Sequence, residues 1–240
     1  MPKIELMQGD CLEKMKDIPD KSIDMILCDL PYGTTSCKWD VVIPFEPLWE
    51  QYKRIIKDRG AIVLFGSEPF SSQLRMSNLK MYKYDWVWNK VRGVGFQIAK
   101  VRPMQSHEII SVFGKGAINY YPIMWEREKK KTSKCYTSSD SSPLKYNDGE
   151  VREYTHSYPK SIIEVSNANQ KGKVHPTQKP VALLEYLIKT YTLEGEMVLD
   201  NCMGSGSTGV ACKNLNRNFI GIELNPEYFK IAEKRINENL

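Results

Sequence analysis

Several carboxylates in this chain stand directly after short apolar runs, where an acidic side chain can take part in chemistry. Asp29 follows the run IDMILC and opens the stretch DLPYG, and Asp200 ends the run EMVLD. Glu223 ends a further run, NFIGIE, some 23 residues after Asp200. Such runs are typical of buried strands, and ligands of α/β proteins bind at the carboxyl ends of strands. The placement therefore indicates a site built from strand ends.

A glycine-rich loop follows Asp200. In VLDNCMGSGSTG, residues 198–209, Gly204 and Gly206 open a helix and let the backbone approach a ligand closely. The carboxylate of Glu223, at the end of the next strand, can accept both hydroxyls of a ribose. A lone G-x-G is as often an ordinary tight turn, but together with this acid it indicates a nucleoside-containing cofactor.

Two further segments fit such a cofactor less specifically. Asp10 and Cys11 end the first apolar run, and the Asp10 carboxylate can either receive an adenine amino group or cap a helix that begins at Cys11. In HPTQKP, residues 175–180, the side chains of His175, Thr177 and Lys179 precede a helix. They can bind a carboxylate there, because free N–H groups and the helix dipole add to the lysine charge. The alternative is a plain helix entry.

Seven apolar runs predict the strands that position these groups. Separated by helix-like stretches, they favour a mostly parallel sheet with helices on both faces. Helices are expected within residues 44–58, 175–191 and 225–236, and Asn225 is the expected cap of the last of these. The seven runs are KIELMQ, IDMILC, GAIVLFG, YDWVWN, EIISVFG, EMVLDN and NFIGIEL.

The positive charge of the chain is concentrated in one segment. Residues 90–134 hold ten Lys or Arg and three acids, a net charge of +7, whereas the whole chain carries +5. A basic segment on a near-neutral body is expected of a protein that touches phosphates, although a solvated lysine-rich loop has the same composition. The candidate DNA-binding residues are Lys90, Arg92, Lys100, Arg102, Lys129, Lys130 and Lys131.

Composition argues against several classes of protein. No apolar run is long enough to span a bilayer, and the N-terminus lacks a signal-peptide pattern, so a cytoplasmic protein is expected. The six cysteines and three histidines lack the spacing of metal ligands, so we expect reduced cysteines and no metal. The length suits one α/β domain of residues 1–240, with an insertion at 116–174 where the periodicity breaks down.

Together these motifs resemble one family. DLPYG resembles the D-P-P-Y motif of amino-methyltransferases, VLDNCMGSGST their D-P-F-x-G-S-G-T loop, and HPTQKP the segment beside that loop. Residues 88–113 also resemble the family's segment before its target-recognition region. The chain is thus similar to S-adenosylmethionine-dependent DNA amino-methyltransferases. Because the catalytic motif precedes the cofactor loop, the order is that of the β class. Leu30, Asn201 and Cys202 depart from the family pattern.

The resemblance implies a fold and a set of partners. The fold is a Rossmann-like α/β domain with a seven-stranded, mainly parallel sheet whose last strand is antiparallel, and residues 116–174 form the target-recognition insertion. S-adenosylmethionine would bind Asp10, Cys11, Asp29, His175, Thr177, Lys179, Asp200, Gly204, Gly206 and Glu223. Double-stranded DNA would be the substrate, in the nucleoid of a bacterial or phage-infected cell. A homodimer and a cognate restriction endonuclease are further partners that the family suggests.

The same resemblance gives roles to the DLPYG turn. Asp29 and a carbonyl near Leu30 or Pro31 would accept the hydrogens of an exocyclic amine on a flipped-out base. Pro31 would stiffen the turn. Tyr32 would stack on the base, an interaction worth about 1–3 kcal/mol, and its hydroxyl would be dispensable.

Four other functions compete with methylation of adenine N6. N4-cytosine methylation uses a similar pocket, but family members acting on cytosine usually carry Ser where Asp29 stands. Methylation of RNA fits the recognition insertion less well. A nicotinamide oxidoreductase would leave DLPYG and HPTQKP without a role. A DNA-binding protein without activity would have no use for intact carboxylates and an intact tyrosine at Asp29, Tyr32, Asp200 and Glu223.

Overall fold

The structure is a computed structural model that describes residues 2–34, 40–134, 151–167 and 178–238. The chain forms two compact units. The first comprises Met1–Tyr121 with Ser161–Leu240, and the second comprises Pro122–Lys160. No helix in the described ranges has the length and apolar character needed to cross a membrane. Nor do the described side chains include three or more His, Cys, Asp or Glu grouped so as to hold a metal ion.

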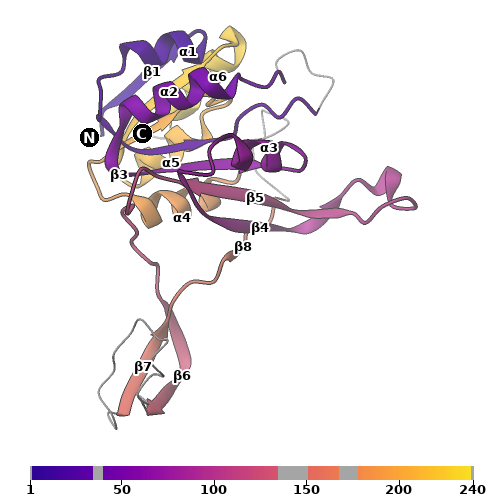
Figure 1. Ribbon diagram of the computed structural model, residues 1–240, viewed down its shortest axis with the longest axis vertical. Helices are drawn as coiled ribbons and strands as arrows, with labels where there is room; N and C mark the ends of the chain where they lie inside the picture. Colours follow the sequence, from indigo (N-terminus) through magenta and orange to yellow (C-terminus); the bar gives the residue numbers. More distant parts are fainter. Residues whose placement is uncertain (1, 35–39, 135–150, 168–177, 239–240) are drawn as a thin grey trace. The chain divides into compact units, whose positions relative to one another are not determined.

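An eight-stranded sheet forms the centre of the first unit, in the order β1-β10-β9-β2-β3-β5-β4-β8 (Figure 1). Every neighbouring pair is parallel except those of β5, which runs antiparallel to both β3 and β4. The strands are β1 (Ile4–Gln8), β2 (Ile23–Cys28), β3 (Ile56–Gly66), β4 (Tyr82–Val94), β5 (Gln105–Phe113), β8 (Ile162–Glu164), β9 (Met197–Asp200) and β10 (Asn218–Glu223).

All seven apolar runs form strands of this sheet, which confirms the mainly parallel α/β class. Two details of the expectation were wrong. The sheet has an eighth strand, β8, because a three-residue segment pairs with β4 at the sheet edge. It has no apolar run to reveal it, since only Ile163 of its three residues is buried. The antiparallel strand is β5, which lies inside the sheet, and the last strand of the chain, β10, is parallel to both neighbours.

Helices pack on both faces of the sheet and make two apolar cores. One core holds buried residues of α4, α5 and α6, and the other holds those of α1, α2 and α3. All six residues of β2 are buried, as expected of a strand covered on both faces. The helices are α1 (Cys11–Lys14), α2 (Phe45–Ile55), α3 (Phe70–Ser77), α4 (Val181–Tyr191), α5 (Ser207–Asn214) and α6 (Pro226–Glu238), with 3-10 turns η1 (Met15–Asp17) and η2 (Phe96–Ile98).

The second unit is an antiparallel hairpin of β6 (Trp125–Lys134) and β7 (Val151–Ser157). Most of its described side chains are exposed, including Trp125 and Tyr154, so the unit has little core of its own. A two-stranded hairpin is only marginally stable in isolation. Its bounds are narrower than the expected insertion of residues 116–174, because β8 belongs to the large sheet.

Candidate active site

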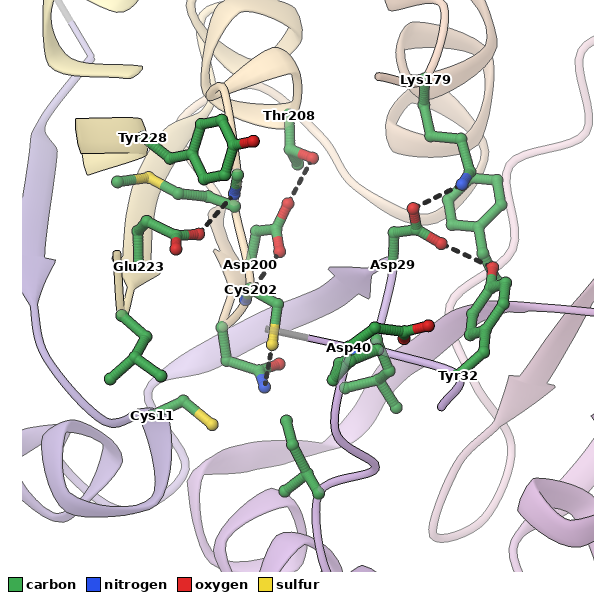
Figure 2. Close-up of a pocket in the computed structure, with 18 of the residues that line it drawn as sticks. Cys11, Asp29, Tyr32, Asp40, Lys179, Asp200, Cys202, Thr208, Glu223 and Tyr228 are labelled. Carbon is green, nitrogen blue, oxygen red and sulfur yellow. Dashed lines mark hydrogen bonds and ion pairs between the residues drawn. The ribbon is translucent and has the colours of Figure 1, made fainter. Parts of the chain in front are cut away.

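A cavity of about 860 Å³ lies where the carboxyl ends of the central strands meet. The last residues of β9 and β10 and the segments that follow β1 and β2 contribute carboxylates to its lining: Asp200, Glu223, Asp10 and Asp29. Figure 2 shows Asp29, Tyr32 and Lys179 grouped on one side, Glu223 and Tyr228 on the other, and Asp200 between them. We call the first group, with Glu108 and Lys90, the Asp29 end, and the second, with Asp200 and Gly204, the glycine-loop end.

Glu223 holds the glycine loop in place at the strand end. Its Oε2 accepts the backbone N–H of Gly204 at 2.9 Å, and its Oε1 accepts that of Asn225 at 2.8 Å. Burial raises the pKa of Glu223 above its usual value, although these N–H groups oppose the rise. Gly206 has φ 78°, and a Cβ added there would lie 2.9 Å from the Cβ of Ala232 in α6. Glycine is therefore required for the loop to pass this helix.

Asp200 is committed to the same loop. Its Oδ1 accepts the backbone N–H of Cys202 at 3.1 Å, and its Oδ2 accepts the Thr208 hydroxyl at 2.6 Å. Burial raises the pKa of Asp200 to about 6, because it outweighs the hydrogen bonds that favour the ionised form. Asp200 thus ties the end of β9 to the first turn of α5 (Figure 2).

Asp10 forms the helix cap that was one of its two candidate roles. Its Oδ1 accepts the N–H groups of Leu12 at 2.8 Å and Glu13 at 3.3 Å. Asp10 and Cys11 also line the cavity, so the cap does not remove Asp10 from the site. The Cys11 thiol is buried and free, and a hydrogen bond with Cys202, together with burial, raises its pKa.

The DLPYG turn is fixed from both sides. The Tyr32 hydroxyl donates to Asp29 Oδ1 at 2.6 Å, and the Tyr32 ring stacks on Phe70 with centroids 4.9 Å apart. The Asp40 carboxylate accepts the N–H of Gly33 at 2.8 Å, where φ is 67°. Pro31 and Leu30 complete this wall of the cavity. The Tyr32 hydroxyl therefore has a partner that the sequence argument left out.

Lys179 lies against Asp29 and not at the glycine loop. Its Nζ donates to Asp29 Oδ2 at 2.5 Å and lies 3.4 Å from Glu108 Oε2. Glu108, on β5, also accepts a hydrogen bond from Lys90 on β4. The HPTQKP motif led us to expect Lys179 at the cofactor, whereas its ammonium group is paired with two carboxylates of the protein. His175 and Thr177, from the same motif, lie outside the described residues.

The exposed basic residues fall in two places. Arg92 is exposed near the end of β4, and Lys100 and Arg102 are exposed in the segment that joins β4 and β5. Residues 129–131 are exposed on β6. Lys90, which was expected to contact phosphates, is only 8% exposed and is paired with Glu108. The expectation rested on the net charge of residues 90–134, and this charge gives no information on how deeply each side chain is buried.

Sequence reasoning missed Glu108 together with the two aromatic rings beside it. Phe65 and Trp88 line the cavity and are nearly inaccessible, and the ammonium groups of Lys179 and Lys90 lie over them at 5.1 and 5.3 Å from the ring centroids. One signal was available: Glu108 is an acid at the start of the apolar run EIISVF.

Several known proteins are similar to this chain. A family model described as DNA methylase matches residues 23–234. The type II methyltransferase M.HpaI of Haemophilus parainfluenzae is 30% identical over 246 residues, which cover 97% of this chain and 74% of that protein.

Solved structures are also similar. A crystal structure of the M1.HpyAVI–SAM complex has 27% identity and a TM-score of 0.67, and covers 98% of this chain and 99% of its own. The cytosine-N4-specific PvuII DNA methyltransferase has a TM-score of 0.69 over 99% of this chain and 91% of its own. At 16% identity, the second likeness shows the fold alone.

Proposed function

Since the chain belongs to the DNA methylase family and is an S-adenosylmethionine-dependent DNA amino-methyltransferase of the β class, we propose that it methylates the N6 amine of adenine. The target would be a flipped-out base within a specific site of double-stranded DNA. The observation that carries the proposal is Asp29, with Pro31 and Tyr32, in the same cavity as the Glu223–glycine loop arrangement.

The glycine-loop end suits the cofactor's nucleoside. Each oxygen of Glu223 accepts one backbone N–H and keeps lone pairs for ribose hydroxyls. Asp10 uses Oδ1 for its helix cap, which leaves Oδ2 to accept the adenine amino group. The two glycines allow close backbone approach, and Cys11 lines the same cavity. When bound, S-adenosylmethionine supplies a methyl group on a positively charged sulfur.

The Asp29 end suits an exocyclic amine. The lone pair of such an amine is delocalised into the base ring, so the free amine is a poor nucleophile. Asp29 accepts one amine hydrogen and the carbonyl of Leu30 or Pro31 accepts the other, which favours a tetrahedral nitrogen. The nitrogen would take the methyl group that S-adenosylmethionine supplies, leaving a neutral thioether, and would release one proton by way of Asp29 to solvent. The Asp29 carboxylate lines the same cavity and would also favour a positively charged cofactor.

Contacts with DNA are assigned to the exposed basic residues. Arg92, Lys100 and Arg102 on one segment, with Lys129, Lys130 and Lys131 on β6, would neutralise phosphates. Residues 116–174, which include the β6–β7 hairpin, would read the site. A homodimer and a cognate restriction endonuclease are further proposals from the family.

N4-cytosine methylation is the second candidate, because the PvuII enzyme shares the fold and both amines suit two acceptors. Asp29 favours adenine, since the cytosine enzymes that this chain resembles usually carry Ser there. An oxidoreductase would leave the Asp29 end without a role.

One experiment separates the candidates. Plasmid DNA from cells expressing the protein is digested to nucleosides and analysed by mass spectrometry, with cells expressing Asp29→Ala as the control. N6-methyladenine in the first sample alone is expected. N4-methylcytosine alone would overturn the adenine assignment, and absence of both would overturn methylation. Single-molecule sequencing of the same DNA identifies the recognition site.

A further inference from the structure

Four charged side chains form an alternating row at the Asp29 end. Lys90 donates to Glu108, Glu108 lies 3.4 Å from Lys179, and Lys179 donates to Asp29 at 2.5 Å. The row joins β4, β5, the segment before α4 and the turn after β2. The side chains of Lys90, Glu108 and Lys179 are 10%, 12% and 9% exposed. Burying charged groups costs desolvation free energy, which the pairing of two positive with two negative groups offsets only in part. A row of this kind therefore suggests a function beyond stability.

Glu108 is the unusual member of this row. Its Oε1 accepts from Lys90, but its Oε2 is buried and accepts no hydrogen bond, although the Lys179 ammonium is 3.4 Å away. Lys179 is thus shared unequally, with a hydrogen bond to Asp29 and only a longer electrostatic contact to Glu108. Without Glu108, the whole positive charge of Lys179 would act on Asp29.

We propose that Glu108, Lys179 and Lys90 are positioning residues that set how strongly Asp29 accepts a hydrogen bond from the target amine. This inference rests on the proposed role of Asp29 in methyl transfer. Lys179 orients the carboxylate and keeps it ionised, while Glu108 offsets part of the lysine charge so that the carboxylate remains a strong acceptor. Lys90 keeps Glu108 ionised in its buried position.

The electrostatics of the row agree with this division of roles. Burial raises the pKa of Asp29, Lys179 lowers it and Glu108 raises it. For Glu108, burial is outweighed by Lys179 and Lys90, so its pKa lies below the usual value. The pKa of Asp29 therefore lies above its usual value and that of Glu108 below, because Glu108 has two lysine partners and Asp29 has one. The titratable or charged groups facing it are Tyr32, Cys28, Asp200, Glu108 and Lys179, with Lys90 behind Glu108.

The proposal predicts opposite effects from two neighbouring substitutions. The reaction needs ionised Asp29, so the rate falls when the pH drops through its pKa. Glu108→Gln removes a negative charge and should move this acid limb to lower pH. Lys179→Met removes a positive charge and should move it to higher pH. Shifts of roughly one pH unit are expected for charges this close.

The test measures single-turnover methylation of duplex DNA carrying the identified site, across pH 4.5–9, so that product release does not mask the chemistry. At the plateau we expect about a tenfold lower rate for Glu108→Gln, with Kd values for cofactor and DNA changed less than about threefold. Glu108→Gln/Lys90→Met is measured as well. This double variant also removes Lys90, the cation that Glu108→Gln leaves without its carboxylate partner. It should show the same shift to lower pH, and it replaces the single variant in the test if that variant folds poorly.

A matched control lies on the same two strands. Asp85, on β4, accepts from Ser111 of β5 at 2.6 Å and pairs with Arg75, but it does not line the cavity. Asp85→Asn should lower the melting temperature without moving the acid limb. The proposal would be overturned if the acid limb lay at the same pH in all variants, or if Glu108→Gln and Lys179→Met moved it in the same direction. A wild-type product of N4-methylcytosine would sink the adenine assignment but leave these shifts decisive, whereas a wild type that methylates nothing would overturn both.

Discussion

The two ends of the cavity hold their carboxylates in different ways. At the glycine-loop end, Glu223 and Asp200 are bound by backbone N–H groups and one hydroxyl from residues at most 19 positions away. At the Asp29 end, Asp29 is bound by side chains, and its partner Lys179 is 150 positions away. Local main-chain bonds are set by the loop itself, whereas side-chain bonds depend on how distant strands pack.

This difference agrees with what each end has to do. A nucleoside is recognised by hydrogen bonds of fixed geometry, and backbone donors keep Glu223 rigid. An acceptor for a reacting amine must change its interactions during the reaction. The side chains of Tyr32 and Lys179 tune Asp29 with one hydrogen bond to each oxygen, which leaves lone pairs for the amine. The comparison can be tested by removing one group at a time from each end.

The largest effect is expected for Asp29→Ala, with methylation reduced about a thousandfold or more, because the lost hydrogen bond strengthens as the amine nitrogen becomes tetrahedral. The fold should survive, since Lys179 keeps Glu108 as a partner 3.4 Å away. Single-turnover rates, with DNA affinity and melting temperature measured in parallel, test this expectation. A variant with full activity would remove Asp29 from the mechanism.

The fold and the glycine-loop end could be predicted from the sequence because both depend on local patterns. The apolar runs gave seven of the eight strands, and Asn225 caps α6 as expected, accepting the N–H of Glu227 at 2.8 Å. The exception, β8, is stabilised by pairing with β4 at the sheet edge and not by an apolar face. Because β4 and β8 are far apart in the sequence, the residue pattern of neither segment predicts their pairing.

The Asp29 end could be predicted only in part, because it too depends on pairing between segments that are distant in the sequence. The DLPYG turn identified Asp29 itself, but Glu108 and Lys90 meet it only after β4 and β5 have paired beside β3. Lys90 was assigned to the DNA surface from segment charge, and Lys179 to the cofactor from its motif. Both ammonium groups lie in the row of charges beside Asp29.

At the glycine-loop end, Asp200 should make stability depend on pH. Burial raises its pKa from 3.8 to about 6, so the folded protein binds its proton more tightly than the unfolded chain does. The contribution of this group to stability therefore decreases as the pH rises from about 4 to 6, by about 3 kcal/mol in total. Asp200→Asn should lose less stability over this window, as measured by urea unfolding at each pH.

Asp58 offers a control of opposite sign. Its carboxylate is exposed, and a hydrogen bond with Lys21 lowers its pKa. Asp58→Asn should therefore change the pH dependence only slightly, and in the opposite direction, because solvent screens an exposed pair. If Asp200→Asn and the wild type gave parallel curves between pH 4 and 6, Asp200 would not titrate in this window.

For Glu223→Ala we expect at least a tenfold weaker affinity for S-adenosylmethionine, measured by calorimetry. The ribose hydroxyls lose a charged acceptor worth about 1.5–3 kcal/mol, and Gly204 loses the partner that holds its N–H. Glu223→Gln keeps one acceptor oxygen and should lose less. Unchanged affinity in a folded Glu223→Ala variant would place the ribose elsewhere and leave the loop with a purely structural role.

The smallest effect is expected for Tyr32→Phe. The ring keeps its contact with Phe70, so stacking should persist, but Asp29 Oδ1 loses the hydroxyl that donates to it at 2.6 Å. Because this hydrogen bond lowers the pKa of Asp29, its loss should move the acid limb to higher pH. Asp29 keeps Lys179, so the plateau rate should fall only about threefold to tenfold, whereas Tyr32→Ala, which also loses the ring, should be markedly slower. Single-turnover rates across pH for both variants measure these effects. A Tyr32→Phe enzyme as inactive as Asp29→Ala would mean that the hydroxyl has its own part in the chemistry, and that Lys179 alone does not keep Asp29 in its working state.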